Sequence, residues 1–161
     1  LYMSLIKNEN FEHVIQKATE LGVNNIIPVI TEYTNHKFDK NNCDKKTIRW
    51  NKIAISASEQ SGRVFIPKIH NPIDINQITF TADEFNITLC PYSSNSESLI
   101  VEIVSNNIFN IFIGPEGGFS DSEMGLFIRN KFNTINLGSR ILKAETAPIN
   151  IMSTINFLKG N

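Results

Sequence analysis

The sequence predicts one α/β domain in which a mostly parallel sheet is flanked by helices. Short β-branched or apolar runs alternate along the chain with longer stretches whose apolar residues fall at helical spacing. That alternation is typical of parallel strands joined by helices, and no internal repeat or domain break interrupts it. The 161 residues, 41% of them hydrophobic, suffice for one compact core.

Five stretches carry the helical pattern. The first ends at Gly22, a residue that suits a helix C-terminus. The fourth begins with Ser120 and Glu123, which have the spacing of a capping box. Residues 35–46 are polar throughout and predict a mobile loop. The expected helices are 9–22, about 45–61, about 96–106, the stretch after Ser120 and about 146–158, with Ile48, Ile53, Ala54, Ala57, Leu99, Ile100, Ile103, Val104, Met124, Phe127, Ile128, Ile149, Met152, Ile155 and Phe157 facing inward.

Five shorter runs predict strands. The run that ends at Ile113 is the most apolar of them and leads directly into a glycine-rich segment. Pro67 limits the second run to an edge of the sheet, because proline donates no ladder hydrogen bond. The expected strands are 26–30, 64–69, 87–89, 108–113 and 134–137.

Charge and cysteine usage exclude several classes of protein. The net charge is −1, unlike that of a strongly basic nucleic-acid binder, although residues 1–68 hold ten Lys/Arg against seven Asp/Glu. Cys43 and Cys90 have no His partners at metal-ligand spacing, so we expect reduced thiols in a cytosolic protein and no metal site. No apolar run could span a membrane. The chain starts at Leu1, and we expect it to be a segment of a longer protein.

Three loops that follow predicted strands are expected to form the walls of one pocket. They are Cys90–Ser94, Gly114–Gly118 and Gly138–Ala147. Ligands of parallel α/β sheets bind beyond the carboxyl ends of the strands, so the loops converge if the three strands are neighbours.

The loop Gly114–Gly118 predicts a close approach of backbone to a ligand. Its glycines leave the backbone bare, Pro115 stiffens the turn, and the helix that follows offers free N–H groups. An ordinary tight connection would account equally well for a Gly-Gly turn taken alone. A phosphate cradle is unsupported, because neither Gly-Lys-Ser/Thr nor G-x-G-x-x-G is present.

Two other segments carry charged residues with alternative roles. The third loop places Arg140, Lys143 and Glu145 around apolar Ile141 and Leu142, as either a solvated loop or a clamp for a flat ring and a polar substrate. Arg63 either satisfies helix carbonyls or contacts a phosphate or base.

Four motifs in order resemble the RsmE family, the small-subunit ribosomal RNA uracil-N3 methyltransferases of the SPOUT superfamily. The resemblance extends from about residue 5 to 158. The motifs are QKATELGV at 16–23, EQSGR at 59–63, IGPEGGFS at 113–120 with Glu123, and LGSRILKAETA at 137–147.

This resemblance implies a single SPOUT domain over 1–161 with a deep trefoil knot near the C-terminal end. It also implies a cytoplasmic homodimer that methylates N3 of a uridine in 16S ribosomal RNA. A PUA-like RNA-binding domain would lie upstream of this chain. S-adenosylmethionine would be bound by Leu89, Pro91, Tyr92, Ile113, Gly114, Pro115, Glu116, Gly117, Gly118, Leu137, Gly138, Arg140, Ile141, Leu142, Thr146 and Ala147.

The catalytic roles follow from what the reaction requires. Glu145 is the candidate base for the N3 proton, since Glu116 is expected to support the loop and Glu123 the capping box. Arg140 and Arg63 would stabilise the uridinate or hold a phosphate.

The chain departs from the family at Tyr33, Ser139, Lys143 and Ala144. The departures at Tyr33, Lys143 and Ala144 favour the alternative of a catalytically impaired RNA-binding domain with the same fold. A phosphate-binding α/β protein is a third reading, disfavoured by the missing Lys-Ser/Thr.

Overall fold

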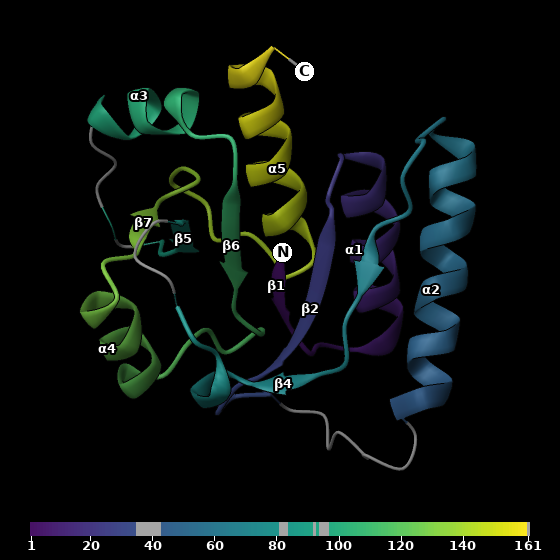
Figure 1. Cartoon of the computed structure of the whole chain (residues 1–161). Coiled ribbons are helices and arrows are strands. Elements are labelled where there is room, and N and C mark those ends of the chain that lie inside the picture. Colours follow the sequence, from purple (N-terminus) through teal and green to yellow (C-terminus); the bar gives the residue numbers. More distant parts are fainter. Residues whose placement is uncertain (35–42, 81–83, 92, 94–96, 161) are drawn as a thin grey trace.

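The computed structural model contains one sheet, and the described residues pair only in parallel (Figure 1). The structure describes residues 1–34, 43–80, 84–91, 93 and 97–160. The strand order is β3-β2-β1-β6-β5-β7, and β4 also pairs with β2. The strands are β1 Tyr2–Ser4, β2 Asn25–Ile30, β3 Lys68–Ile69, β4 Ile73–Asp74, β5 Phe85–Leu89, β6 Phe109–Ile113 and β7 Asn133–Ile135.

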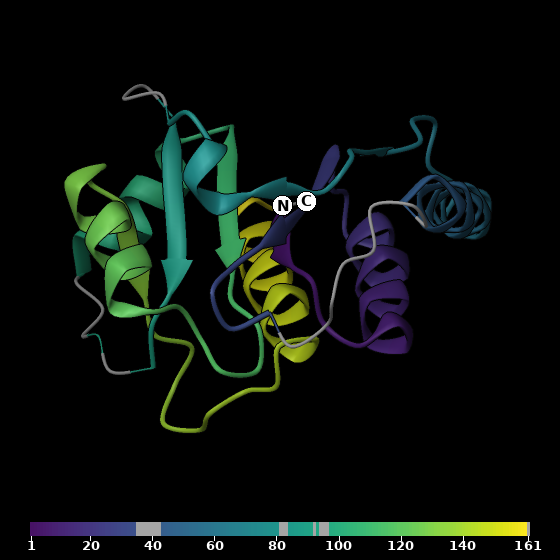
Figure 2. The same ribbon diagram turned by 90° about the horizontal axis from the view of Figure 1, so that it is seen from below.

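The sheet is covered on both faces, which confirms the predicted α/β layering. Figure 2 shows α1 and α5 together on one side of β1 and β2, while Ile75 of η2 packs with Val29 and Phe112 in a second cluster. Residues of α4 join the hydrophobic cluster on the η2 side. The helices are α1 Asn8–Glu20, α2 Cys43–Gln60, α3 Glu97–Ser105, α4 Asp121–Arg129 and α5 Thr146–Lys159, and η2 is a 3-10 turn over Ile75–Gln77.

Two boundaries differ most from the sequence-based expectation. The helix α2 begins at Cys43, so residues 43–46 are helical and not loop, while the rest of the predicted loop lies outside the described residues. The strand expected over 64–69 is reduced to Lys68–Ile69 at the sheet edge. Val64, Phe65 and Ile66 before it are exposed.

Several helices bury fewer of their apolar side chains than the sequence predicted. Each of these helices packs along one side only, as α2 does against α1 and α3 against α5. The side chain of Leu99 lies outside the described part. The residues that were expected to be buried and are instead exposed are Ile48, Ile100, Val104, Ile128 and Phe157.

Phe112 of β6 lies at the centre of an aromatic cluster on the α4 face. Its ring stacks on Tyr2 of β1 with 4.1 Å between centroids and lies 4.9 Å from Phe132 and 5.7 Å from Phe127. Phe112 and Phe127 are almost fully buried. This cluster joins the sheet centre to α4, the helix that follows the glycine loop.

The strand order meets the condition on which the predicted pocket depended. β5 pairs with β6 on one side and with β7 on the other. The loops after these three strands therefore begin side by side at the carboxyl edge of the sheet. The chain then returns from β7 to α5, which packs beneath β6 and against α1 and α3. The trefoil knot stays a prediction.

Two further findings concern the described residues alone. No helix among them is long and apolar enough to cross a membrane. They also contain no group of three or more His, Cys, Asp or Glu residues arranged to hold a metal ion.

Replacing Phe112 with alanine is expected to lower the free energy of unfolding by about 3–5 kcal/mol, because the substitution leaves a cavity among packed rings. Chemical denaturation measures the loss. Phe157→Ala is the matched control, since that ring is 84% exposed and its removal should change stability by less than about 0.5 kcal/mol. Equal effects of the two substitutions would contradict the assigned core.

Candidate functional site at the carboxyl edge of the sheet

Hydrogen bonds between the loops after β5 and β7 hold the first wall of the site. The Cys90 amide donates to the Ile135 carbonyl at 2.9 Å. The Asn136 side-chain amide donates to the carbonyls of Pro91 at 2.9 Å and Ser93 at 3.0 Å, and its oxygen accepts from the Gly138 amide at 2.9 Å. Asn136 therefore fixes the two loops to each other.

The glycine loop after β6 is closed on itself and covered from one side. The Gly118 amide donates to the carbonyl of the buried Pro115 at 2.9 Å, and Gly118 has a φ of 74°. A Cβ placed on Gly117 would lie 3.2 Å from the Cβ of Tyr33. A Cβ on Gly114 would lie 3.3 Å from the Phe119 ring. Both positions thus lack room for a side chain.

The capping box at the start of α4 is confirmed, and its carboxylate has a second task. One oxygen of Glu123 accepts from the Ser120 amide at 2.8 Å, while the Glu123 amide donates to the Ser120 hydroxyl at 3.4 Å. The other oxygen accepts from the Glu32 amide at 2.9 Å. Because Glu123 is only 4% exposed, this buried carboxylate fixes the loop after β2 against the loop after β6.

The loop after β7 presents its charged residues to solvent. Arg140, Ile141 and Lys143 are exposed, whereas Ala144 is buried in the core. The amides of Thr146 and Ala147 donate to the Lys143 carbonyl at 2.9 and 3.0 Å, which starts α5. Glu145 occupies the N-cap position of α5, but its side chain makes no capping hydrogen bond. Its carboxylate is therefore available for another role.

The predicted cofactor residues lie on three loops that start from neighbouring strands. Tyr92 is outside the described residues. Ile113 is 3% exposed and packs in the core, so only its backbone can face a ligand. Pro91, Glu116, Gly117, Gly138 and Thr146 are exposed, and Leu89, Gly114, Gly118, Leu137, Leu142 and Ala147 are half-buried.

Arg63 lies at the opposite edge of the sheet from these loops. Its guanidinium donates to the carbonyls of Thr19 and Val23, each at 2.8 Å, at the C-terminal end of α1. Desolvation lowers the pKa of Arg63. Of the two roles that the sequence left open, the structure shows bonding to carbonyls, but at the end of α1 and not of α2, the helix that Arg63 follows. Within one chain this position separates Arg63 from Arg140 and Glu145.

Glu116 was expected to support the glycine loop through hydrogen bonds, and the structure does not show such bonds among the described residues. Its carboxylate is exposed and forms no hydrogen bond to the loop in the part of the chain that the structure describes. The loop is closed by backbone bonding instead.

Sequence reasoning missed two residues near the site, Glu32 and Asn136, and noted Tyr33 only as a departure from the family and not as a contact of the glycine loop. Of these, Asn136 alone carried a local signal, because it directly follows a strand and precedes a glycine, a setting in which Asn commonly bonds backbone two residues on.

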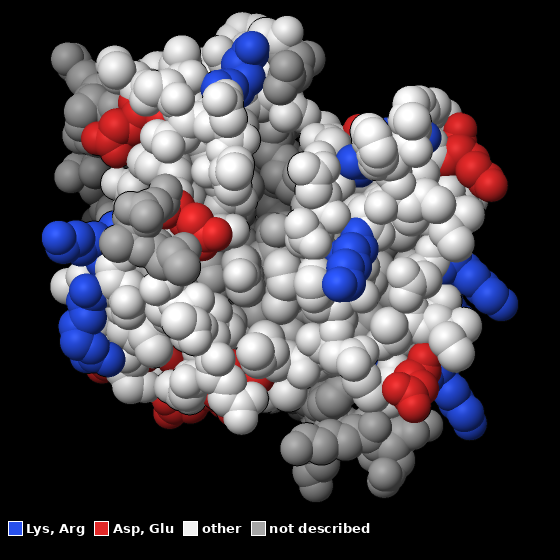
Figure 3. Space-filling model, in the orientation of Figure 1, with Lys and Arg blue, Asp and Glu red and all other residues white. Residues whose placement is uncertain are grey.

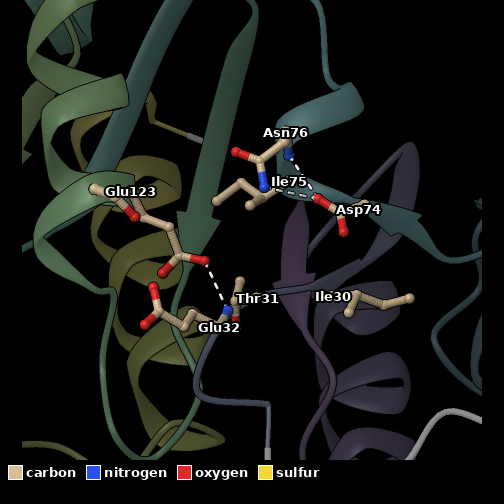
Figure 4. Close-up of a pocket in the computed structure, with 8 residues that line it drawn as sticks. Ile30, Thr31, Glu32, Asp74, Ile75, Asn76 and Glu123 are labelled. Atoms are coloured by element: carbon tan, nitrogen blue, oxygen red, sulfur yellow. Dashed lines mark hydrogen bonds between the residues drawn. The ribbon is translucent and has the colours of Figure 1, made fainter.

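A polar pocket of about 270 Å³ lies beside the first turn of α4, the helix that follows the glycine loop (Figure 4). It lies between the end of β2, the start of α4 and the segment formed by β4 and η2. Its floor is Thr31 and the buried Glu123, and the Glu32 and Asp74 carboxylates lie across the gap from each other in Figure 4. The other lining residues are Ile30, Ile75, Asn76 and Ser122.

The fold and the loops define the class of the protein. It is a parallel α/β domain in which loops with accessible backbone lie together at the carboxyl edge of adjacent strands. A family model described as an RNA methyltransferase domain matches residues 1–156. The chain belongs to the RNA methyltransferase domain family.

Relatives of known name share this sequence over most of its length. The "Ribosomal RNA small subunit methyltransferase E" of Mesomycoplasma hyopneumoniae is 35% identical over 95% of this chain and 66% of its own. That of Buchnera aphidicola subsp. Schizaphis graminum is 38% identical over 96% of this chain and 63% of its own. The chain thus spans about two thirds of the length of these relatives.

Solved structures have the same fold. A Legionella pneumophila protein in complex with the bound cofactor SAM has a TM-score of 0.89 and 38% identity, covering 97% of this chain and 64% of that one. The ribosomal RNA small subunit methyltransferase E of Neisseria gonorrhoeae, bound to S-adenosyl methionine, has a TM-score of 0.88 and 28% identity, covering 98% and 64%.

Replacing Glu123 with glutamine is expected to release the loop after β2. Glutamine keeps one acceptor but turns an NH₂ group toward a backbone donor, at a cost of about 1–3 kcal/mol in a buried position. Hydrogen exchange at the Glu32 amide should accelerate. Asp121→Asn in the same helix turn is the control, because Asp121 is exposed. Unchanged protection of Glu32 would show that the bond does not hold the loop.

Proposed function

We propose that this chain is the catalytic domain of an S-adenosylmethionine-dependent methyltransferase that modifies N3 of a uridine in 16S ribosomal RNA. The observation that carries the proposal is the adjacency of β6, β5 and β7, because it brings the three predicted loops to one edge. The relatives named as small-subunit methyltransferases and the neighbours with bound cofactor support it.

The residues present suit the cofactor. Nothing lies within 4 Å of the place that a Cβ would take on Gly118 or Gly138, so a ligand can approach the backbone at both positions. Leu89, Leu137 and Leu142 offer partly exposed apolar surface for an adenine ring. Exposed backbone N–H and C=O groups of the three loops would read its polar edges.

The bound cofactor supplies an electrophilic methyl group. The chain must hold an unpaired uridine in line with that group and accept the N3 proton. Glu145 is the candidate acceptor, since its carboxylate lies on a wall of the site and has no capping duty. We assign to the exposed guanidinium of Arg140 the stabilisation of the negative charge that develops on the uracil ring. Arg63 is not assigned a step within one chain.

The proposal extends to the setting in which the domain acts. The substrate is the RNA of the small ribosomal subunit, the compartment is the cytoplasm, and an upstream PUA-like domain contributes RNA contacts. A homodimer is supported by exposed apolar side chains on α3 and α5, such as Ile100, Val104 and Phe157. The alternative, a catalytically impaired RNA-binding domain, is favoured only by Tyr33, Lys143 and Ala144.

Replacing Gly117 with valine is expected to weaken S-adenosylmethionine binding at least tenfold while the far-ultraviolet circular dichroism is kept. The new side chain would press on Tyr33 and displace the loop. Titration calorimetry measures the Kd. Gly125→Ala in α4 is the control, because its Cβ would meet only the flexible end of Arg129. An unchanged Kd for the valine variant would remove the glycine loop from the cofactor site.

The reaction itself is tested by mass spectrometry of 16S ribosomal RNA from a strain that lacks the gene. The full-length protein should restore one N3-methylated uridine. Glu145→Gln should bind the cofactor normally and methylate at least tenfold more slowly in single turnovers, because general bases commonly contribute about 10²–10⁴-fold. A normal rate would show that Glu145 is not the base. Cofactor binding without any restored methylation would favour the impaired domain.

A further inference from the structure

The pocket between β4, η2 and α4 lies outside the three loops assigned to the cofactor. Its lining residues come from the loop after β2, from residues 74–76 and from the first turn of α4. It is nevertheless joined to the cofactor site. Glu123 bridges the loop after β2 to the loop after β6, and Tyr33 lies against Gly117. A ligand in this pocket would therefore lie beside the glycine loop.

Three carboxylates dominate the polar lining of the pocket, which also includes the hydroxyls of Thr31 and Ser122 and the amide of Asn76. Both oxygens of Glu123 are occupied by backbone amides, and one oxygen of Asp74 accepts from the Asn76 amide and side chain. The Glu32 carboxylate and the second oxygen of Asp74 have no partner among the described residues. The carboxylates of Glu32 and Asp74 thus keep open acceptor oxygens at the pocket, while the oxygens of Glu123 are already bonded to the backbone around it.

The charge of the lining limits which ligand can enter. No Lys, Arg or His is among the described residues that line the pocket. In Figure 3 acidic side chains appear along the lower edge of this face, between the positions of α4 and β4. A phosphate group is excluded by like charge. Ile75 also lines the pocket but is only 1% exposed, so the surface open to a ligand is mainly polar.

We propose that this pocket binds a base of the RNA strand that neighbours the target uridine, and that it selects guanine. A guanine presents two adjacent N–H donors on its Watson–Crick edge, which match the two oxygens of one carboxylate, whereas uracil presents one donor between two acceptors. Unpaired RNA bases are commonly read on this edge. This inference rests on the proposed function, because it takes the strand at the glycine loop to be RNA.

Removing a carboxylate should change RNA affinity in opposite directions for this subsite and for a purely electrostatic effect of net charge. RNA is a polyanion, so removal of a carboxylate should strengthen its binding if only net charge matters. A carboxylate that accepts from a base should behave in the opposite way, and its loss should weaken the binding of one sequence only. A weaker and less selective Glu32→Gln variant is therefore the signature of the subsite.

The test uses full-length protein with S-adenosylhomocysteine and fluorescent single-stranded RNA heptamers that carry one central uridine. The flanking bases are guanosine, inosine, which lacks one of the two donors, or uridine. For the wild type we expect affinities in the order guanosine, inosine, uridine, with about a tenfold difference between the extremes. Glu32→Gln should abolish most of this difference, whereas Asp74→Asn, which alters one open oxygen, should reduce it. Asp74→Asn keeps an acceptor for the Asn76 amide, so the turn at η2 is retained.

Asp121→Asn is the matched control, because it removes a charge from the same turn of α4 without lining the pocket. It should keep the full preference for guanosine. The proposal is overturned if Glu32→Gln binds all three heptamers as well as the wild type or better. It is equally overturned if a short arginine-rich peptide binds in a Glu32-dependent manner while the heptamers show no preference, since the pocket would then serve a cationic protein segment.

Calorimetry with S-adenosylmethionine on the same preparations distinguishes a failure of the proposed subsite from a failure of the proposed function. If the wild type binds the cofactor but shows no base preference, only the subsite is wrong. If the wild type binds neither cofactor nor RNA, the proposed function fails.

Discussion

The parallel pairing of β5 with β6 and with β7 is the constraint on which the candidate site depends. The chain forms β5, crosses to β6, and then returns past β5 to form β7 on its other side. This order gathers three separate loops at one edge, where no local motif could bring them. Asn136 then fixes two of the loops to each other.

Short-range sequence patterns predicted most helices and strands, but they did not predict the full set of strands in the sheet. The capping box at Ser120, the turn at Gly22 and the strand that ends at Ile113 have causes within a few residues, and each is found. β1 was missed because three residues at the start of the chain carry no periodicity. Yet it is the central strand between β2 and β6, and its Tyr2 stacks on Phe112.

The limits of the site prediction have a similar physical origin. A sequence pattern shows which residues follow a strand, but not which distant segment packs on them. Glu32 and Tyr33 follow β2 and have no motif of their own. They reach the glycine loop because Glu123, 91 residues farther along, accepts the Glu32 amide. Arg63 was given a role in the site, whereas its guanidinium bonds to carbonyls at the end of α1, some forty residues earlier in the chain.

The buried Glu123 carboxylate explains how an acidic pocket can persist beside the proposed RNA site. A buried carboxylate is tolerated only when hydrogen bonds satisfy it, and two backbone amides from different loops do so here. Its charge thus serves architecture and leaves Glu32 and Asp74 as the open acceptors. Phosphate attraction must then come from cations elsewhere, such as the exposed Arg140 and Lys143 on the opposite wall. A strand held at its backbone by one wall could present its bases to the other.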